Sequence, residues 1–221
     1  MDWTALRVSL ALGLWTVALL LPAGVWAGHQ LATRQFRGKP ILEALVATPL
    51  ILPPTVLGFY LLTVFSPRSP VGAAFESVIG HTLAFSFPGL VVASAIVNIP
   101  FVVQPIQRAF EGVPLDVREA AACCGLTPWR RFLRIEGPLA WPGILTAVIL
   151  TFAHTLGEFG VVLMVGGSLP GQTRTLSIAI YDRMQAFDDH RAGMMAATLL
   201  VIAVVALTVT QVLGRQVVRR G

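Results

Sequence analysis

The chain has 221 residues, of which 55% are hydrophobic and only 12% are charged, and its formal net charge is +5. A soluble globular domain carries roughly 25% charged residues, so about half of the usual solubilising surface is missing. The mean hydropathy of +0.75 agrees with that shortage. These values exclude a soluble enzyme, a disulfide-stapled secreted domain and a nucleic-acid-binding module.

Five long stretches without formal charge organise the chain, and they are residues 8–33, 44–67, 77–107, 137–157 and 192–214. A helix that crosses the hydrocarbon core needs about 20 apolar residues at a rise of about 1.5 Å each. We therefore predict an all-α integral membrane protein with a single transmembrane domain, residues 1–221. Its five transmembrane helices are expected at about 8–28, 41–65, 82–107, 139–163 and 194–214.

The lysines and arginines divide unevenly between the two sides that five spans define. Eleven fall in one set of loops, namely Arg34, Arg37, Lys39, Arg108, Arg118, Arg130, Arg131, Arg134, Arg215, Arg219 and Arg220. Five fall in the other set, namely Arg7, Arg68, Arg174, Arg183 and Arg191. Because cytoplasmic loops are enriched in cations, we expect the N-terminus outside and the C-terminus inside. The basic charge thus indicates topology and not a nucleic-acid partner.

The first apolar stretch has an alternative interpretation as a secretory signal peptide over residues 8–27. Ala23 and Ala27 stand where a cleavage site would be, but Asp2 opposes Arg7 in front of the apolar run. Signal peptides have a net positive start and an apolar region of about 7–15 residues. The sequence therefore favours a retained transmembrane helix.

The second span is interrupted by Pro49 and by the pair Pro53 and Pro54. A proline inside a membrane helix removes a backbone hydrogen bond and kinks the axis. Such breaks are tolerated where protein or a water-filled cavity satisfies the freed backbone groups. We predict a broken helix that faces a cavity or neighbouring helices.

The loop 108–138 has the sequence pattern of two short helices joined by a glycine. Asp116, three residues before Glu119, is expected to cap the first helix. Gly125 stands where a left-handed helix terminus belongs, and Thr127 with the following proline starts the second helix. This loop is predicted to be a docking surface for a cytoplasmic partner.

Motifs for chemistry are scarce in the sequence. There is no Walker A loop, so ATP hydrolysis would belong to another chain, and the cysteine and histidine spacings predict no metal. His154 and Glu158 are four residues apart and share one face of the fourth span. An intramembrane enzyme or proton relay that uses this pair is one interpretation. In the other, Glu158 caps or hydrogen-bonds a broken helix, and the chain has neither catalytic residues nor a cofactor.

One segment of the loop resembles the EAA loop of ABC importer permeases: Glu119, Ala120, Ala121 and Gly125 with their spacing, followed by Ile135 and Pro138. The pattern departs only at Gly137, where that family has leucine. Residues 48–60 look like the second-span block of molybdate permeases, and residues 154–182 look like their fourth-span block. The resemblance covers about residues 5–212.

The resemblance implies a type I ABC importer permease in the inner membrane that works by alternating access. Its implied partners are a second copy of the chain, two cytoplasmic ABC ATPase subunits and an extracytoplasmic molybdate-binding protein. Glu119, Ala120, Ala121 and Gly125 would contact the ATPase, with Arg118 and Arg130 at the rim. The same machinery for sulfate or tungstate remains the alternative substrate assignment, and an ion-coupled transporter working alone is the remaining rival class.

A doubly charged oxyanion is expelled by a low dielectric, so its path should follow hydroxyls, helix N-termini and freed N–H groups. The candidate lining residues are Pro53, Pro54, Thr55, Thr151 and Thr155. An ionised Glu158 at the narrowest point would repel such a substrate. We therefore predict a structural or gating role for that carboxylate.

Overall fold

The computed structural model describes residues 1–218, and within that range every regular element is a helix. The prediction of an all-α protein is confirmed. The elements in chain order are α1 Trp3–Thr33, α2 Lys39–Ile51, α3 Pro54–Phe65, α4 Pro70–Ile79, α5 Phe87–Glu111, α6 Leu115–Cys123, α7 Pro128–Arg131, the π-helix η1 Phe132–Glu136, α8 Gly137–Gly157, α9 Gly160–Gly166, α10 Leu176–Gln185 and α11 Asp189–Val218.

Four helical segments are long and apolar enough to span a membrane: Trp3–Thr33, Phe87–Glu111, Pro128–Gly157 and Asp189–Val212. The pair α2 and α3 passes the same test only when taken together, and it bends by 107° at the break. Five spans therefore result when the bent pair counts as one, as the prolines of the second span predicted. The fourth span ends earlier than the predicted residue 163, because the helix stops at Gly157 and the backbone of Glu158 is extended.

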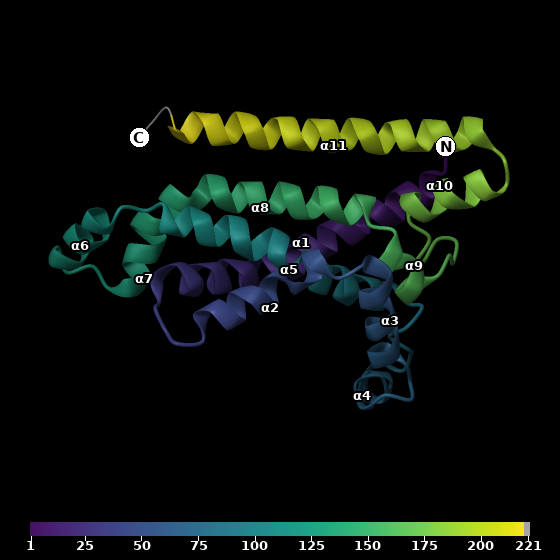
Figure 1. Cartoon of the computed structure of the whole chain (residues 1–221), viewed down its shortest axis with the longest axis horizontal. Coiled ribbons are helices and arrows are strands. Elements are labelled where there is room, and N and C mark those ends of the chain that lie inside the picture. The colour runs from purple at the N-terminus through teal and green to yellow at the C-terminus, as the bar shows by residue number, and fades with distance from the viewer. Residues whose placement is uncertain (219–221) are drawn as a thin grey trace.

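The positions of the two chain ends show that the bent pair α2 and α3 counts as one passage along the bundle (Figure 1). The N-terminus and the described end of α11 lie at opposite ends of the bundle, with α6 and α7 at the same end as Val218. An odd number of crossings is needed to bring the two termini to opposite ends. Four straight helices are an even number, so the bent pair returns the chain along the bundle between α1 and α5.

Helices α1, α5 and α8 pack together at the centre, α11 lies against α8 and α10, and α3 lies against α9. Two buried apolar clusters divide the length of the bundle. One joins α1, α3, α5, α9 and α10 around Leu90, and the other joins α1, α5 and α8 around Ile106. Glycines make the α1–α5 contact close: a Cβ added at Gly24 would stand 2.0 Å from Val102 Cγ1, and one at Gly28 would stand 2.7 Å from Ile106 Cγ2. Small residues four apart are a common means of bringing membrane helices together.

The connections between the second and third spans and between the fourth and fifth spans each contain a short helix, namely α4 and α10. The Ser69 hydroxyl accepts a hydrogen bond from the Gly72 amide at 2.9 Å and caps α4, which is an N-cap signal that the sequence contains. The prediction that Asp116 caps the helix of the inner loop is wrong. That helix begins at Leu115, directly after Pro114, and Asp116 lies in its first turn.

Candidate functional site

The site begins where two broken helices touch. Helix α3 starts at Pro54 after the 107° bend, and α9 starts at Gly160 after the break that follows α8. A Cβ on Gly160 would stand 2.7 Å from Pro54 Cβ, and one on Gly58 would stand 2.8 Å from Met164 Cβ. The absence of side chains at these two glycines therefore allows α3 and α9 to pack in direct contact.

The residues at the bend remain accessible on the surface of the chain. Pro53, Pro54 and Thr55 are all exposed. The carbonyl of Pro53 accepts hydrogen bonds from the amides of Val56 and Leu57, at 2.9 and 3.1 Å. This arrangement places the start of a helix, with its partial positive charge, beside an accessible surface.

Asn98 organises a polar cluster between α5 and α8, and its side chain is fully buried. Its amide nitrogen donates to the Ser94 carbonyl at 2.7 Å and to Thr155 Oγ1 at 3.1 Å. Thr155 Oγ1 in turn donates to the Thr151 carbonyl at 2.8 Å. Thr151 and Thr155 are 0% and 2% exposed, so in this conformation both lie inside the chain and not on an open surface.

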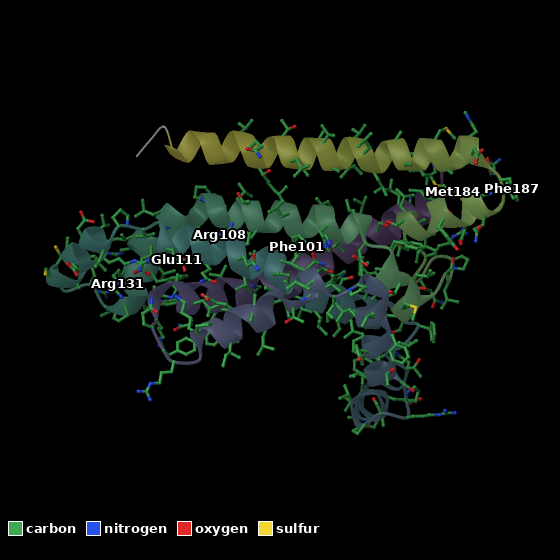
Figure 2. The ribbon with its side chains drawn as sticks, viewed as in Figure 1. Phe101, Arg108, Glu111, Arg131, Met184 and Phe187 are labelled. Atoms are coloured by element: carbon green, nitrogen blue, oxygen red, sulfur yellow. The ribbon has the colours of Figure 1, made fainter. Side chains whose placement is uncertain are left out.

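His154 joins the same cluster from the side that is less buried. Its Nδ1 lies 3.1 Å from Asn98 Oδ1, and its ring stacks on Phe101 with centroids 4.0 Å apart. Because the Asn98 nitrogen donates to two other acceptors, its oxygen must accept, and His154 Nδ1 carries the proton. Figure 2 labels Phe101 partway along the bundle, beside α8. The sequence analysis did not single out Phe101, although it lies one helical turn after Asn98.

Glu158 forms the hydrogen bond of a helix cap. Its Oε1 accepts from the amide of Val161 at 3.0 Å, at the start of α9. Its Oε2 lies 4.0 Å from His154 Nε2, and the residue is only 7% exposed. The carboxylate therefore occupies the break between α8 and α9 and hydrogen-bonds the start of α9.

The loop 108–138 forms a separate surface at the end of the bundle that also holds the described end of α11 (Figure 1). Gly125 adopts a left-handed conformation with φ +72°, as predicted, and its amide donates to the Ala122 carbonyl at 2.9 Å. Thr127 caps the next helix, since its hydroxyl accepts from the Arg130 amide at 3.4 Å. The predicted helix, glycine turn and helix are therefore all present.

The six residues that the resemblance placed at an ATPase contact divide into two groups. Those exposed on the loop are Glu119, Ala120, Gly125 and Arg130. Ala121 is 5% exposed, and the Arg118 side chain is 14% exposed, so both point toward the body of the chain. The accessible members of this set are therefore two small residues, one carboxylate and one guanidinium.

Among residues 1–218, no three His, Cys, Asp or Glu side chains come together as a metal site. Cys123 and Cys124 are exposed at the end of α6. The polar cluster around Asn98 and the surface of the loop 108–138 are therefore separate regions of the chain.

A bundle of long apolar helices with one broken span and a protruding helical loop defines a multi-span membrane protein. Residues 21–220 match the family described as the binding-protein-dependent transport system inner membrane component. The chain belongs to this family.

Two relatives and one solved structure illustrate the similarity. The molybdenum transport system permease protein ModB of Azotobacter vinelandii is 44% identical over 206 residues, with 93% of this chain and 91% of the relative covered. A probable sulfate transport system permease protein, cysT of Anthoceros angustus, is 34% identical over 169 residues, with 76% and 58% covered. The crystal structure of a bacterial ABC transporter that imports the acidic polysaccharide alginate contains a chain with a TM-score of 0.71, at 17% identity and with 98% and 78% covered. That likeness concerns the fold alone.

Proposed function

We propose that this chain is the permease subunit of an ABC importer that moves molybdate across the inner membrane into the cytoplasm. The similarity to the Azotobacter vinelandii permease over nearly the whole chain carries this proposal. Sulfate is the second candidate substrate, because the similarity to the sulfate permease is also substantial. Tungstate, a tetrahedral dianion like molybdate, would use the same path.

Residues 1–221 act as one transmembrane domain with the N-terminus outside and with the loop 108–138 and the C-terminus in the cytoplasm. The division of cations, eleven against five, supports this orientation. The common position of α6, α7 and the end of α11 at one end of the bundle supports it as well.

The working unit is a homodimer with two cytoplasmic ATPase subunits and an extracytoplasmic binding protein. None of the residues of α2 is buried within the chain. In the apolar stretch of α11, only 11% of the residues are buried. Faces of this kind need lipid or a second copy of the chain to cover them. A dimer would bring the two broken spans to a shared central path.

The ATPase is engaged by the exposed face of α6 and its glycine turn, through Glu119, Ala120 and Gly125, with Arg130 at the rim. Closure of the ATPase pair would move these loops and switch the cavity by rigid-body motion. Glu119→Lys reverses the charge of an exposed carboxylate on this face, and we expect it to reduce ATP-driven uptake while leaving membrane insertion intact. Uptake at the wild-type rate would contradict the docking role.

The anion path runs along the bend at Pro53, Pro54 and Thr55, where a helix start and a hydroxyl are exposed. Thr151 and Thr155 would join this path only in a state in which α5 and α8 have moved apart. Glu158 contributes a capping hydrogen bond and not a binding contact. A catalytic role for His154 and Glu158 has less support, because both side chains already take part in hydrogen bonds that organise the helices.

The test is ATP-dependent accumulation of molybdenum in proteoliposomes that contain this chain, its ATPase and its binding protein. We expect uptake that requires ATP and resists an excess of sulfate. Uptake that sulfate abolishes would reassign the substrate and keep the machinery. An intact complex that accumulates no oxyanion with ATP would refute the proposed function.

A further inference from the structure

A buried carboxylate at the cytoplasmic end of the bundle has a set of partners that none of the roles above uses. The Glu136 side chain is 1% exposed and lies at the end of η1, immediately before α8. Three cationic or titratable side chains surround it, and with it they form what we call the Glu136 cluster: His29, Arg118, Arg131 and Glu136.

The distances join three separate parts of the chain. His29 Nε2 of α1 lies 2.7 Å from Glu136 Oε2. Arg131 Nε of α7 lies 3.1 Å, and Arg118 Nε of α6 lies 3.6 Å, from Glu136 Oε1. A buried carboxylate is stable only when it is paired in this way, so the cluster fixes α1, α6 and the start of α8 relative to one another.

Aromatic and backbone groups enclose the cluster and extend it to α5. The His29 ring packs edge-on against Phe110 and Phe132, with centroids 4.9 and 5.2 Å apart. Arg118 Nη2 donates to the carbonyl of Phe110, which is fully buried near the end of α5. Arg118 therefore connects α6 with both the end of α5 and the start of α8.

The π-helix explains how Glu136 reaches this position. A π turn adds one residue to a helix and rotates everything after it by about 100°. The turn Phe132–Glu136 lies inside a continuous helical run from Pro128 to Gly157. Figure 2 labels Arg131 at this junction, beside α6 and α7. Such turns occur frequently at functional sites.

We propose that the Glu136 cluster transmits the movement of α6 to α1, α5 and α8, with Arg118 and Glu136 as positioning residues for transport. This inference rests on the proposed function, in which the ATPase moves α6. Most of α6 is exposed. Glu119, Ala120 and Ala122, which follow Arg118 on this helix, are all exposed. The Arg118 contacts to Glu136 and Phe110 therefore form a noncovalent route from α6 to the spans.

Arg118→Gln is the primary variant, because it cuts the α6 link and leaves Glu136 with His29 and Arg131. We expect the reconstituted complex with ATPase and binding protein to keep hydrolysing ATP while uptake falls. The ATP used per anion should rise between about 2- and 30-fold, which is the range for residues that carry coupling between distant sites. Arg118→Lys keeps the charge and should recover part of the loss.

The matched control is Arg134→Gln, which removes an exposed arginine from the same π turn. It should leave the ratio of ATP to anion unchanged. If Arg118→Gln fails to assemble, the double variant Glu136→Gln with Arg131→Gln removes one charge of each sign. The double variant removes the central carboxylate of the cluster, and we expect the same rise in the ATP used per anion.

A second measurement does not depend on the substrate. Ser77→Cys, in a chain whose Cys123 and Cys124 are replaced by serine, carries a spin label on the exposed face of α4. We expect a nonhydrolysable ATP analogue to change the distance between the two labels of the wild-type dimer. In Arg118→Gln the same nucleotide should bind without changing that distance.

Two results would overturn the inference. One is a variant with the wild-type ratio of ATP to anion and a normal nucleotide response. The other is uptake and hydrolysis that fall in the same proportion in an intact complex, since the cluster would then affect the rate of the whole cycle and not the coupling. Failure of the proposed substrate is a different result, in which the wild-type labels respond to nucleotide but molybdate and sulfate are not accumulated. If nucleotide does not change the distance between the labels of the wild-type dimer, both the inference and the proposed function are refuted.

Discussion

Glu158 offers the most direct test of how the break between α8 and α9 is stabilised. Glu158→Gln keeps a carbonyl oxygen where Oε1 now accepts the Val161 amide at 3.0 Å. The new amide group keeps the size and shape of the carboxyl group and removes its charge. Glu158→Ala, by contrast, leaves the Val161 amide without an acceptor.

The magnitudes follow from burial. Val161 is 1% exposed, so water cannot replace the lost acceptor in the alanine variant. An unsatisfied buried donor costs about 1–3 kcal/mol in the free energy of unfolding. In the glutamine variant a hydrogen bond to a charged acceptor becomes one to a neutral acceptor, which costs about 1 kcal/mol. The alanine variant should therefore be the less stable of the two.

The assay is thermal unfolding of the purified chain in detergent, together with uptake by the reconstituted complex. We expect Glu158→Gln to retain uptake and Glu158→Ala to lose stability and uptake together. Glu76→Gln is the control, because it removes the same charge from an exposed position on α4. Abolished uptake by an intact Glu158→Gln complex would show that the charge itself is required and would refute the capping role.

Three further predictions test the packing, the polar cluster and the docking loop. Gly28→Leu should lower the free energy of unfolding by about 1–3 kcal/mol, since its Cβ would stand 2.7 Å from Ile106 Cγ2. Gly193→Ala is the control, because its Cβ would meet nothing within 4 Å, and it should raise the free energy of unfolding by up to about 1 kcal/mol. Equal melting temperatures for the two variants would contradict the close α1–α5 contact. Asn98→Ala should lower stability by about 1–2 kcal/mol through its lost hydrogen bonds, and an unchanged melting temperature in detergent would argue against the buried polar cluster. Gly125→Val strains a residue at φ +72° and should reduce ATP-driven uptake without preventing membrane insertion, so normal uptake would refute its place in docking.

Much of the fold follows from local sequence patterns. Charge-free runs of about 20 residues predict the spans, and Gly125 and Thr127 predict the two ends of the glycine turn in the loop. The short helices α4 and α10 were not predicted, because helices of 10 residues give a weak periodic signal among prolines and glycines. The predicted end of the fourth span was also wrong. The sequence stays uncharged after Glu158, which suggested a longer helix, but the helix ends at Gly157.

The site was predictable only where its residues share one helix. Thr151, Thr155 and Glu158 follow from helical spacing. The partners that determine their surroundings come from elsewhere, since Asn98 is 57 residues before Thr155 in sequence. His29 and Glu136 are 107 residues apart. Contacts of that separation depend on how the helices pack, and a single sequence does not specify this packing.

The bend between α2 and α3 also affects how the protein fits its bilayer. Since α3 turns away from α2 by 107°, it extends sideways from the bundle, with α4 beyond it (Figure 1). In a membrane the chain would therefore occupy more area in the leaflet that contains α3 than in the opposite one. A wedge-shaped footprint couples conformation to lateral pressure, so lipids that alter leaflet packing or thickness should shift the balance between conformations of the bundle.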